Sequence, residues 1–422
     1  MRSATIPAPR TVVVVGAGIV GLSTAWFLQE HGVEVTVVDR TGIAAGASWG
    51  NAGWLMTGDV TPLPSPDMLR QGVRGLLSTT SALRVPFRGR PERYWFLLQL
   101  ARSCTADRWE TSLHALQPLS HQALAAYDAL ITGGVAASVS PADHHLAVFT
   151  ALSERDAYAR HLEHMRQIGA PTEFAVLDAA EAQAASPVLS EAVVGAVDVL
   201  DQHYLDATEF LPALAASVLE RGGRLVTGAG VRAIRDIGRS AEVLADTGSG
   251  PQLLRADAVV ACAGVGLPEL VRRFGVTVPL RAGRGYSFSV GVDDVVDEAL
   301  YLPSAHVAAT PWQGRLRMAG TMEFTAAGAP LDRSRVEVMK TAVRPLLRNV
   351  DLDDVRDEWV GARPVTADGR PLAGPTSSGR IWVVGGHAME GMVLGPVTAR
   401  LAVQGLVTGQ LPAELRPFDP LR

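Results

Sequence analysis

Residues 11–39 limit the possible folds more than any other part of the chain. They begin with four consecutive valines after Thr11, a β-branched run typical of a strand that is buried on both faces of a sheet. From Leu22 the pattern changes to that of a helix, and Gly32 suits the position that follows a helix. A second β-branched run then ends at Asp39. Strand, turn, helix and strand in this order predict a parallel βαβ unit.

The turn between the first strand and the helix contains three glycines, Gly16, Gly18 and Gly21. The first permits a tight turn, the second removes the Cβ that would hold a pyrophosphate away from the backbone, and the third lets the helix pack closely on the strand. The helix N-terminus offers free N–H groups to an anion. Asp39, about 20 residues further on, lies where such units hold ribose hydroxyls. The pattern therefore predicts a dinucleotide-binding site.

Two other patterns overlap this region. The uncharged run 11–29 follows Arg2 and Arg10, which also fits a signal peptide or a membrane span. The three glycines and the change of period at Leu22 argue against that interpretation. Residues 46–50 match the Gly-x-Ser-x-Gly of a nucleophile elbow, but a glycine-rich loop follows the serine where that motif requires a helix. We therefore expect neither a transmembrane segment nor a serine hydrolase.

Composition narrows the classes of partner and ligand. The formal net charge is −5 and no basic run stands out, so we expect no binding to nucleic acid or to an anionic membrane. The two cysteines, Cys104 and Cys262, lie far apart, which indicates a reducing compartment and no disulfide framework. His161 and His164 share one face of an expected helix, 153–168, without an acid or cysteine at ligand spacing, so we expect a solvated face and no metal site. These features favour a cytoplasmic protein.

The rest of the chain contains two kinds of segment. Residues 65–185 look mainly helical, with helical spacing over 113–130. From about residue 195 strands alternate with helices, which implies a return to the parallel sheet. Residues 276–356 alternate with period two, which predicts antiparallel strands that wall a pocket. The elements expected where the chain returns are a strand at 196–200, a helix capped by Asp206 and ended by Gly222 and Gly223, strands at 256–264 and 380–384, and a helix at 397–406 with Pro396 in its first turn.

Six motifs, in order over nearly the full length, resemble those of one family. They are Gly16–Gly21 with Asp39 and Arg40, then residues 48–53, 284–287, 320–324, 362–374 and 386–391. With them the chain resembles the FAD-dependent amine and D-amino acid oxidoreductases, which include D-amino acid oxidase, glycine oxidase, monomeric sarcosine oxidase and D-amino acid dehydrogenase. The motifs are most similar to those of the dehydrogenase branch.

The resemblance implies an α/β fold with two discontinuous domains. An FAD-binding, Rossmann-like domain of the GR2 type is expected from residues 1–64, 190–275 and 357–422. An α+β substrate-binding domain that carries the antiparallel sheet is expected from residues 65–189 and 276–356. The second domain is thus inserted into the first in two pieces.

The resemblance also implies a non-covalently bound FAD, with its ADP part on the first βαβ unit and Asp39 at the ribose. Residues 48–53 are expected beside the isoalloxazine ring, and residues 387–393 near its pyrimidine edge. The C-terminal third contains no cysteine, so we expect no covalent link of the sarcosine oxidase type. The residues expected to contact the cofactor are Gly16, Ala17, Gly18, Ile19, Val20, Gly21, Asp39, Arg40, Ser48, Asn51, Ala52, Gly53, Val231, Ala263, Gly264, Gly386, His387, Gly391, Met392 and Val393.

The expected substrate is a small amino acid with a carboxylate. Such a group is costly to bury unpaired in an apolar pocket, and an arginine answers it with a two-pronged fork. The resemblance places three residues at the catalytic site: Arg363 as this fork, Tyr286 where relatives have a substrate-facing hydroxyl, and His387 in the loop that shapes the flavin pocket. A core tyrosine fits Tyr286 equally well. Glu390 departs from the expected pattern, and it fits either a contact with a substrate amine or hydroxyl or a solvated loop acid.

The activity that the resemblance implies is oxidative deamination. The Cα–H of a D-configured or achiral amino acid would leave as hydride to flavin N5, and the imine would hydrolyse to a keto acid or remain cyclic for a ring amine. A helix expected to begin at Pro396 would present its positive end to the flavin.

Several alternatives stay open at this point. Within the family they are a glycine or sarcosine oxidase and a D-proline or hydroxyproline dehydrogenase. Outside it they are an NAD-dependent dehydrogenase and a flavoprotein without turnover. The electron acceptor (O₂, a quinone or a protein), the oligomeric state and peripheral attachment at the inner membrane face are also open.

Overall fold

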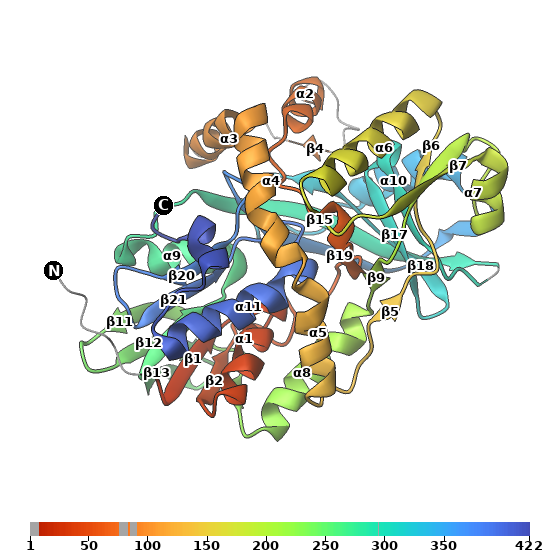
Figure 1. The fold of residues 1–422 in the computed structure, drawn as a ribbon. Coiled ribbons are helices and arrows are strands. Elements are labelled where there is room, and N and C mark those ends of the chain that lie inside the picture. The colour runs from red at the N-terminus through yellow and green to blue at the C-terminus, as the bar shows by residue number, and fades with distance from the viewer. Residues whose placement is uncertain (1–7, 76–82, 85–90, 294) are drawn as a thin grey trace.

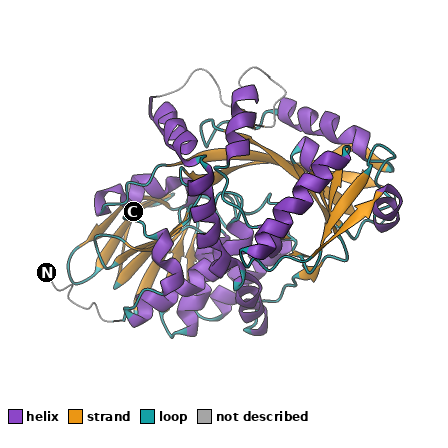
Figure 2. Ribbon diagram, turned by 45° about the horizontal axis from the view of Figure 1, so that its top comes forward, coloured by secondary structure: helices purple, strands orange, loops and turns teal. Residues whose placement is uncertain are grey.

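The computed structural model describes residues 8–75, 83–84, 91–293 and 295–422. Two large sheets lie at opposite ends of the molecule, with helices packed around them (Figure 1), and Figure 2 shows the same arrangement from a second direction. Strands β15 (Leu280–Val292) and β19 (Val350–Thr366) run from one end toward the other (Figure 1). Arg2, and residues 76–82 and 85–90 of the segment expected to be helical, lie outside the described residues.

A six-stranded sheet contains the βαβ unit expected at residues 11–39. Five of its strands are parallel to one another, and the sixth, β20, is antiparallel to β21. In spatial order the strands are β10 (Arg224–Val226), β2 (Glu34–Val38), β1 (Thr11–Val15), β14 (Ala258–Ala261), β21 (Ile381–Gly385) and β20 (Leu372–Pro375).

Both faces of this sheet are covered, as the valine run predicts. Val12 and Val14 belong to a core with the helices on one face, whereas Val13 and Val15 belong to a second core on the other. The helices of the first face include α1 (Ile19–Glu30), α5 (Ala123–Thr132), α8 (Ala207–Glu220) and α11 (Gly391–Thr408). The second face is covered by the three-stranded sheet of β11 (Gly230–Asp236), β12 (Ala241–Thr247) and β13 (Gly250–Ala256), and by α9 (Leu267–Val271).

A nine-stranded sheet, mainly antiparallel, forms the other half. Beside β19 and β15 it contains, in spatial order, β18 (Arg315–Glu323), β17 (Val307–Trp312), β16 (Ala299–Leu302), β6 (His145–Phe149), β8 (Gly195–Val199) and β7 (Phe174–Asp178), and β4 (Leu83–Arg84) pairs with β18. The helices α6 (Leu152–Gln167), α7 (Ala179–Ala185) and α10 (Arg333–Val343) pack on it. The remaining helices are α2 (Pro66–Gly75), α3 (Pro91–Ser103) and α4 (Ala106–Ser120), and a small sheet joins β3 (Trp54–Leu55), β9 (His203–Tyr204) and β5 (Ser140–Pro141).

Two elements predicted between residues 113 and 200 differ from the structure. The strand predicted at 196–200 exists as β8, but it pairs with β6 and β7, so its expected place in the parallel sheet was wrong. All five β8 residues are buried, and such a run does not reveal which sheet it joins. The helix predicted at 113–130 is two helices, α4 and α5, because the chain leaves helical geometry at Gln122, whose ψ is 0°. The limits given for the two domains stay a proposal.

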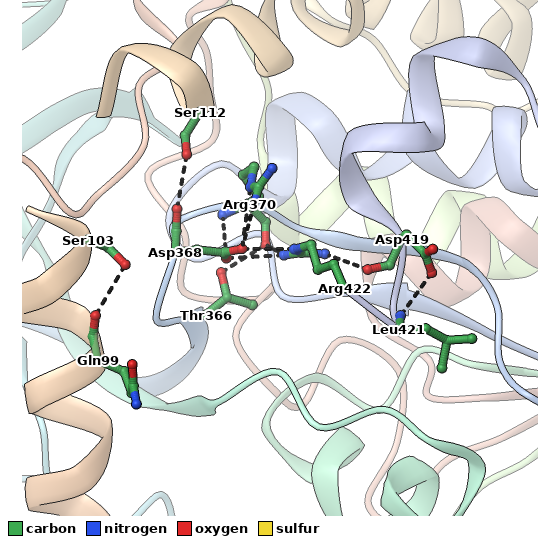
Figure 3. A network of polar contacts seen from close by, with 9 residues as sticks. All are labelled: Gln99, Ser103, Ser112, Thr366, Asp368, Arg370, Asp419, Leu421 and Arg422. Carbon is green, nitrogen blue, oxygen red and sulfur yellow. Dashed lines mark hydrogen bonds and ion pairs between the residues drawn. The ribbon is translucent and has the colours of Figure 1, made fainter. Parts of the chain in front are cut away.

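A polar network holds the turn between β19 and β20 (Figure 3). The guanidinium of Arg422 donates to both carboxylate oxygens of Asp368, at 2.8 and 3.1 Å, and Ser112 of α4 donates to the Asp368 carbonyl. Burial alone would raise the pKa of Asp368, but Arg422 and Arg370 hold it below its usual value. Hydrogen bonds from α4 and from Arg422 therefore hold the turn, and they fix the direction in which the chain leaves β19.

Candidate functional site

The turn between β1 and α1 requires glycine at two positions. Gly16 has φ +112°, and a Cβ there would lie 2.5 Å from the carbonyl oxygen of Cys262. A Cβ on Gly21 would lie 1.9 Å from the carbonyl oxygen of Gly16, which the helix could not tolerate without moving. Ala263 and Gly264 follow β14 beside this turn, since the Cβ position of Gly16 is also 3.4 Å from the Cα of Ala263. Predicted cofactor residues from two distant segments thus meet here.

The carboxylate of Asp39, at the end of β2, lies against the glycine turn. Its Oδ2 accepts a hydrogen bond from the N–H of Ala17 (2.9 Å), and its Oδ1 accepts two from the following turn (2.8 and 3.0 Å). The next side chain, Arg40, runs beside Gly230, the residue before Val231 at the start of β11. Asp39, Arg40 and Val231 are therefore grouped at one end of the predicted site.

The N-terminus of α1 has the features of an anion site. Its N-cap, Gly18, has no side chain to cap the helix, and the first turn contains no acidic residue. Ser48 lies over this end, because its Oγ accepts a hydrogen bond from the N–H of Ile19 (3.2 Å). Val20, in the same turn, lies against Gly395 of α11. Free N–H groups, the helix dipole and the glycine cradle together fit the diphosphate and ribose of a dinucleotide.

A cavity of about 340 Å³ lies next to this region. Of the predicted site residues, it is lined by Asn51, Ala52, Arg363 and Val393. The loop that carries Asn51 is tight, since Asn51 Oδ1 accepts from the N–H of Gly53 (2.8 Å) and Gly53 has φ +77°. Other polar or aromatic side chains at the cavity wall are Trp54, Asp59, Thr61, Tyr301, His306, Thr321, Phe324 and Glu390.

Arg363 reaches the cavity from β19. Gly285 of β15 makes room for it, because a Cβ there would lie 2.1 Å from the guanidinium carbon. Its Nη1 donates to the carbonyl oxygen of Thr321 (2.8 Å), and no carboxylate of the described residues pairs with it. Burial lowers the pKa of Arg363 to about 10, which leaves it cationic at neutral pH. An unpaired guanidinium in a cavity is suited to bind an anion.

Thr321 stands beside this guanidinium in an unusual conformation. Its φ is +60°, an outlier for a β-branched residue, and such strain persists where surrounding contacts impose it, often at functional sites. The Thr321 hydroxyl is buried and has no hydrogen-bond partner among the described residues. The hydroxyl is therefore a buried donor that the described residues leave without an acceptor, which is uncommon in a folded protein.

Asp59 is an acid of the cavity wall that the sequence analysis did not single out. Its carboxylate accepts hydrogen bonds from Tyr158 Oη and His161 Nε2, both at 2.8 Å. The expectation of a solvated face was wrong for His161, which is partly buried against Asp59. The side chain of His164 is 42% exposed, as expected, and pairs with Glu110 at 3.0 Å. Both acids come from other elements, and helical spacing does not reveal them. Within the described residues no cluster of His, Cys, Asp and Glu has the arrangement of a metal site.

Glu390 lines the same cavity, at the N-cap of α11. Its carboxyl does not cap the helix, and no hydrogen bond or ion pair joins it to another described residue. Burial, and secondarily the charge of Asp59, raises the pKa of Glu390 to about 8. The group is therefore an unpaired acid that faces the cavity.

The start of α11 differs from the prediction. The helix begins at Gly391 rather than at Pro396, which lies inside it. A proline leaves the carbonyl four residues earlier, that of Met392, without its helical N–H donor. Tyr127 supplies the donor, since its hydroxyl bonds to the Met392 carbonyl at 2.6 Å. The positive end of the helix dipole thus lies at Gly391, beside Glu390 of the cavity wall, rather than at Pro396.

Tyr286 and His387 do not line the cavity. Tyr286 is fully buried in the core of the nine-stranded sheet, and its hydroxyl donates to Glu323 (3.0 Å). This favours the hypothesis that Tyr286 is a core residue over the hypothesis that its hydroxyl faces the substrate. His387 is buried behind the loop with its Nε2 3.2 Å from the hydroxyl of Thr398. Burial lowers the pKa of His387 to about 4, so the ring is neutral and fits the pocket-shaping role. Its neighbour Gly386 has φ +77°, which turns the chain from β21 toward α11.

Residues 11–404 match the model of the family described as FAD dependent oxidoreductase. The D-amino acid dehydrogenase of Cereibacter sphaeroides is 31% identical over 417 residues, which are 95% of this chain and 92% of that protein. The D-amino acid dehydrogenase of Agrobacterium fabrum is 28% identical over 425 residues, 95% of this chain and 96% of that protein.

Among solved structures, glycine oxidase from Geobacillus kaustophilus is similar with a TM-score of 0.71 at 22% identity, over 98% of both chains. The likeness confirms the α/β fold class that the motifs predicted. No helix of the described residues is both long and apolar enough to cross a membrane.

Proposed function

The chain belongs to the FAD dependent oxidoreductase family, and we propose that it oxidises a D-amino acid, or a small achiral or secondary amino acid, at the α-carbon. The observation that carries the proposal is the unpaired guanidinium of Arg363 in a cavity that also contains acids. The carboxylate of a zwitterionic amino acid matches the guanidinium of Arg363, and its ammonium group matches the acids. The names of the dehydrogenase relatives agree with this substrate class.

FAD would be held by the glycine turn, Asp39 and the N-terminus of α1, and when bound it supplies the hydride acceptor. We propose Ser48, Asn51, Gly53, Met392 and Val393 as further contacts. The N-terminus of α11 would place the positive end of its dipole at the flavin edge of the cavity, where it favours negative charge. Tyr286 has no role in the proposed site, and His387 only shapes it.

Arg363 and Thr321 would fix the substrate carboxylate, and this limits the orientations available to the α-carbon. Apolar walls that include Met56, Leu63 and Phe324 would exclude water from the reacting carbon. The imine released into water would hydrolyse to a keto acid and ammonia, whereas a ring amine would stay cyclic.

The experiment is anaerobic bleaching of the flavin absorbance by D-amino acids, glycine, sarcosine and D-proline analogues. We expect D-amino acids to bleach fastest. Preference for glycine and sarcosine, or for ring amines, would favour one of the two alternatives within the family. A flavin that none of these amines bleaches would overturn the proposal and leave a flavoprotein without turnover.

Reoxidation of the bleached enzyme identifies the electron acceptor. The bleached enzyme is mixed with air-saturated buffer in one experiment and with a soluble quinone under anaerobic conditions in another. A fast reaction with O₂ indicates an oxidase, and a fast reaction with the quinone alone indicates a dehydrogenase.

A further inference from the structure

The carboxyl of Glu390 lies in the cavity without a partner from the described residues, and this contrasts with the other acid there. Asp59 already accepts hydrogen bonds from Tyr158 and His161. The charge of Asp59 is thus met from the protein, whereas that of Glu390 is left to a ligand. A partly buried carboxylate gains most from a cation that also donates hydrogen bonds.

Resting on the proposed function, we infer that Glu390 binds the ammonium group of the substrate and accepts one of its protons, which makes the amine neutral before the α-hydrogen leaves. Arg363 on β19 and Glu390 on α11 then hold the two ends of one zwitterion. Glu390 thereby receives a catalytic role, whereas the sequence left open whether it contacts the substrate or is a solvated loop acid.

The proton transfer balances within the cavity. An N–H bond of the ammonium breaks and an O–H bond forms on the Glu390 carboxylate, while the electron pair stays on nitrogen. That pair then forms the C=N bond as hydride leaves the α-carbon. A base works best when its pKa is near the pH of the reaction, and the pKa of Glu390, about 8, meets this condition.

Other groups around the cavity are less suited to take this proton. Burial lowers the pKa of His387 to about 4, and burial with the Asp59 charge raises that of Tyr301 to about 12. Arg363 stays protonated. The titratable and charged groups that line the cavity with Glu390 are Asp59 of the 3₁₀ turn Thr57–Asp59, Tyr301 of β16, His306 before β17 and Arg363 of β19. Tyr158 and His161 of α6 bond to Asp59, and His387 lies in the loop that precedes Glu390.

Two non-reacting ligands test the binding step without turnover. 2-Aminoisobutyrate has no α-hydrogen, and isobutyrate lacks the amine but keeps the rest of its shape. Calorimetric titration of the FAD-loaded protein should show that Glu390→Gln weakens 2-aminoisobutyrate by about tenfold or more, as expected for a lost charge-assisted hydrogen bond. Isobutyrate should bind the variant at least as well as the wild type. Equal losses for both ligands would overturn the assignment.

The pH dependence of anaerobic bleaching tests the proton transfer. The wild-type rate should rise with pH and level off near the pKa of Glu390, because the carboxylate form is the base. In Glu390→Gln the rate should keep rising toward the pKa of the free amine, and Glu390→Asp should restore part of the plateau. Identical profiles for wild type and Glu390→Gln would overturn the inference.

A matched control removes a carboxylate outside the cavity. Glu191→Gln changes an exposed residue after α7 and should leave both ligand affinities and the pH profile unchanged. The two proposals fail differently: if amines bleach wild type and Glu390→Gln alike, only the role of Glu390 is wrong, whereas if no amine bleaches the wild type, the proposed function is wrong.

Discussion

The two halves of the molecule build their parts of the site in different ways. In the six-stranded half, the proposed cofactor site consists mainly of backbone, with Gly16, Gly18 and Gly21 clustered in one turn. The cavity lies where the nine-stranded sheet meets the start of α11, and it is walled by side chains that are far apart in sequence, from Asp59 to Glu390. A backbone site leaves a spacing of glycines in the sequence, whereas the side chains of the cavity come from separate segments and share no common spacing.

The comparison predicts that damage in the first half removes the cofactor, while damage in the second half spares the cofactor and impairs the substrate. Gly21→Ala should have the largest effect, because the new Cβ would meet the Gly16 carbonyl oxygen at 1.9 Å and push α1 off the sheet. We expect a loss of about 3 kcal/mol of stability or more and little bound FAD. Flavin absorbance per protein and the thermal midpoint measure this. Gly42→Ala is the matched control, since nothing lies within 4 Å of the added Cβ.

Arg363→Ala should come next, with the flavin retained. Loss of a buried, fork-shaped partner for a carboxylate costs about 3–4 kcal/mol, so anaerobic bleaching should slow by about 100- to 1000-fold at low substrate. Arg363→Lys should recover only part of this, because an ammonium lacks the fork. Arg356→Ala, an exposed change on the same strand, should bleach like wild type. Normal bleaching by Arg363→Ala would show that the carboxylate binds elsewhere.

Thr321→Val separates ligand binding from stability. The hydroxyl has no partner among the described residues, so its loss should leave the thermal midpoint nearly unchanged while isobutyrate binds about tenfold more weakly. Thr310→Val should instead lower the stability of the fold, because the Thr310 hydroxyl donates to the Ala52 carbonyl (2.8 Å). It should lose about 1 kcal/mol of stability. A large destabilisation by Thr321→Val would show that the hydroxyl has a structural role.

His161→Gln should have the smallest effect, visible only as a function of pH. Burial alone would lower the pKa of His161, but the charge and hydrogen bond of Asp59 outweigh it and raise the pKa above 6.5. A raised pKa in the folded state stabilises the protein below pH 6.5, and the contribution is lost as pH rises through the folded value. The thermal midpoint of wild type should therefore exceed that of His161→Gln by about 1–2 °C at pH 6 and by less at pH 9. A constant difference would contradict the ion pair.

The same contrast explains what the sequence could predict. The βαβ unit was confirmed because its signals are local: a valine run, a glycine turn, a helix and a second strand follow one another directly in the sequence. The cavity was recognised only in part: the family motifs pointed to Asn51, Ala52, Arg363 and Val393. The role of Thr321 was missed, because neither its positive φ nor its unpartnered hydroxyl follows from residue type. Asp59 had no local signal, and its contact with His161 spans 102 residues. At the start of α11, the carbonyl of Met392 accepts its hydrogen bond from Tyr127, 265 residues away, and no local pattern reveals this contact.

Helix α11 connects the two halves directly. It begins beside the cavity, and one turn later Gly395 lies against Val20 in the first turn of α1, where a Cβ would be only 3.2 Å from the valine methyl. Because one rigid element borders both sites, occupancy of either should favour occupancy of the other, and by thermodynamic reciprocity the two factors are equal. A carboxylate such as isobutyrate in the purification buffer should then slow the loss of flavin from this protein.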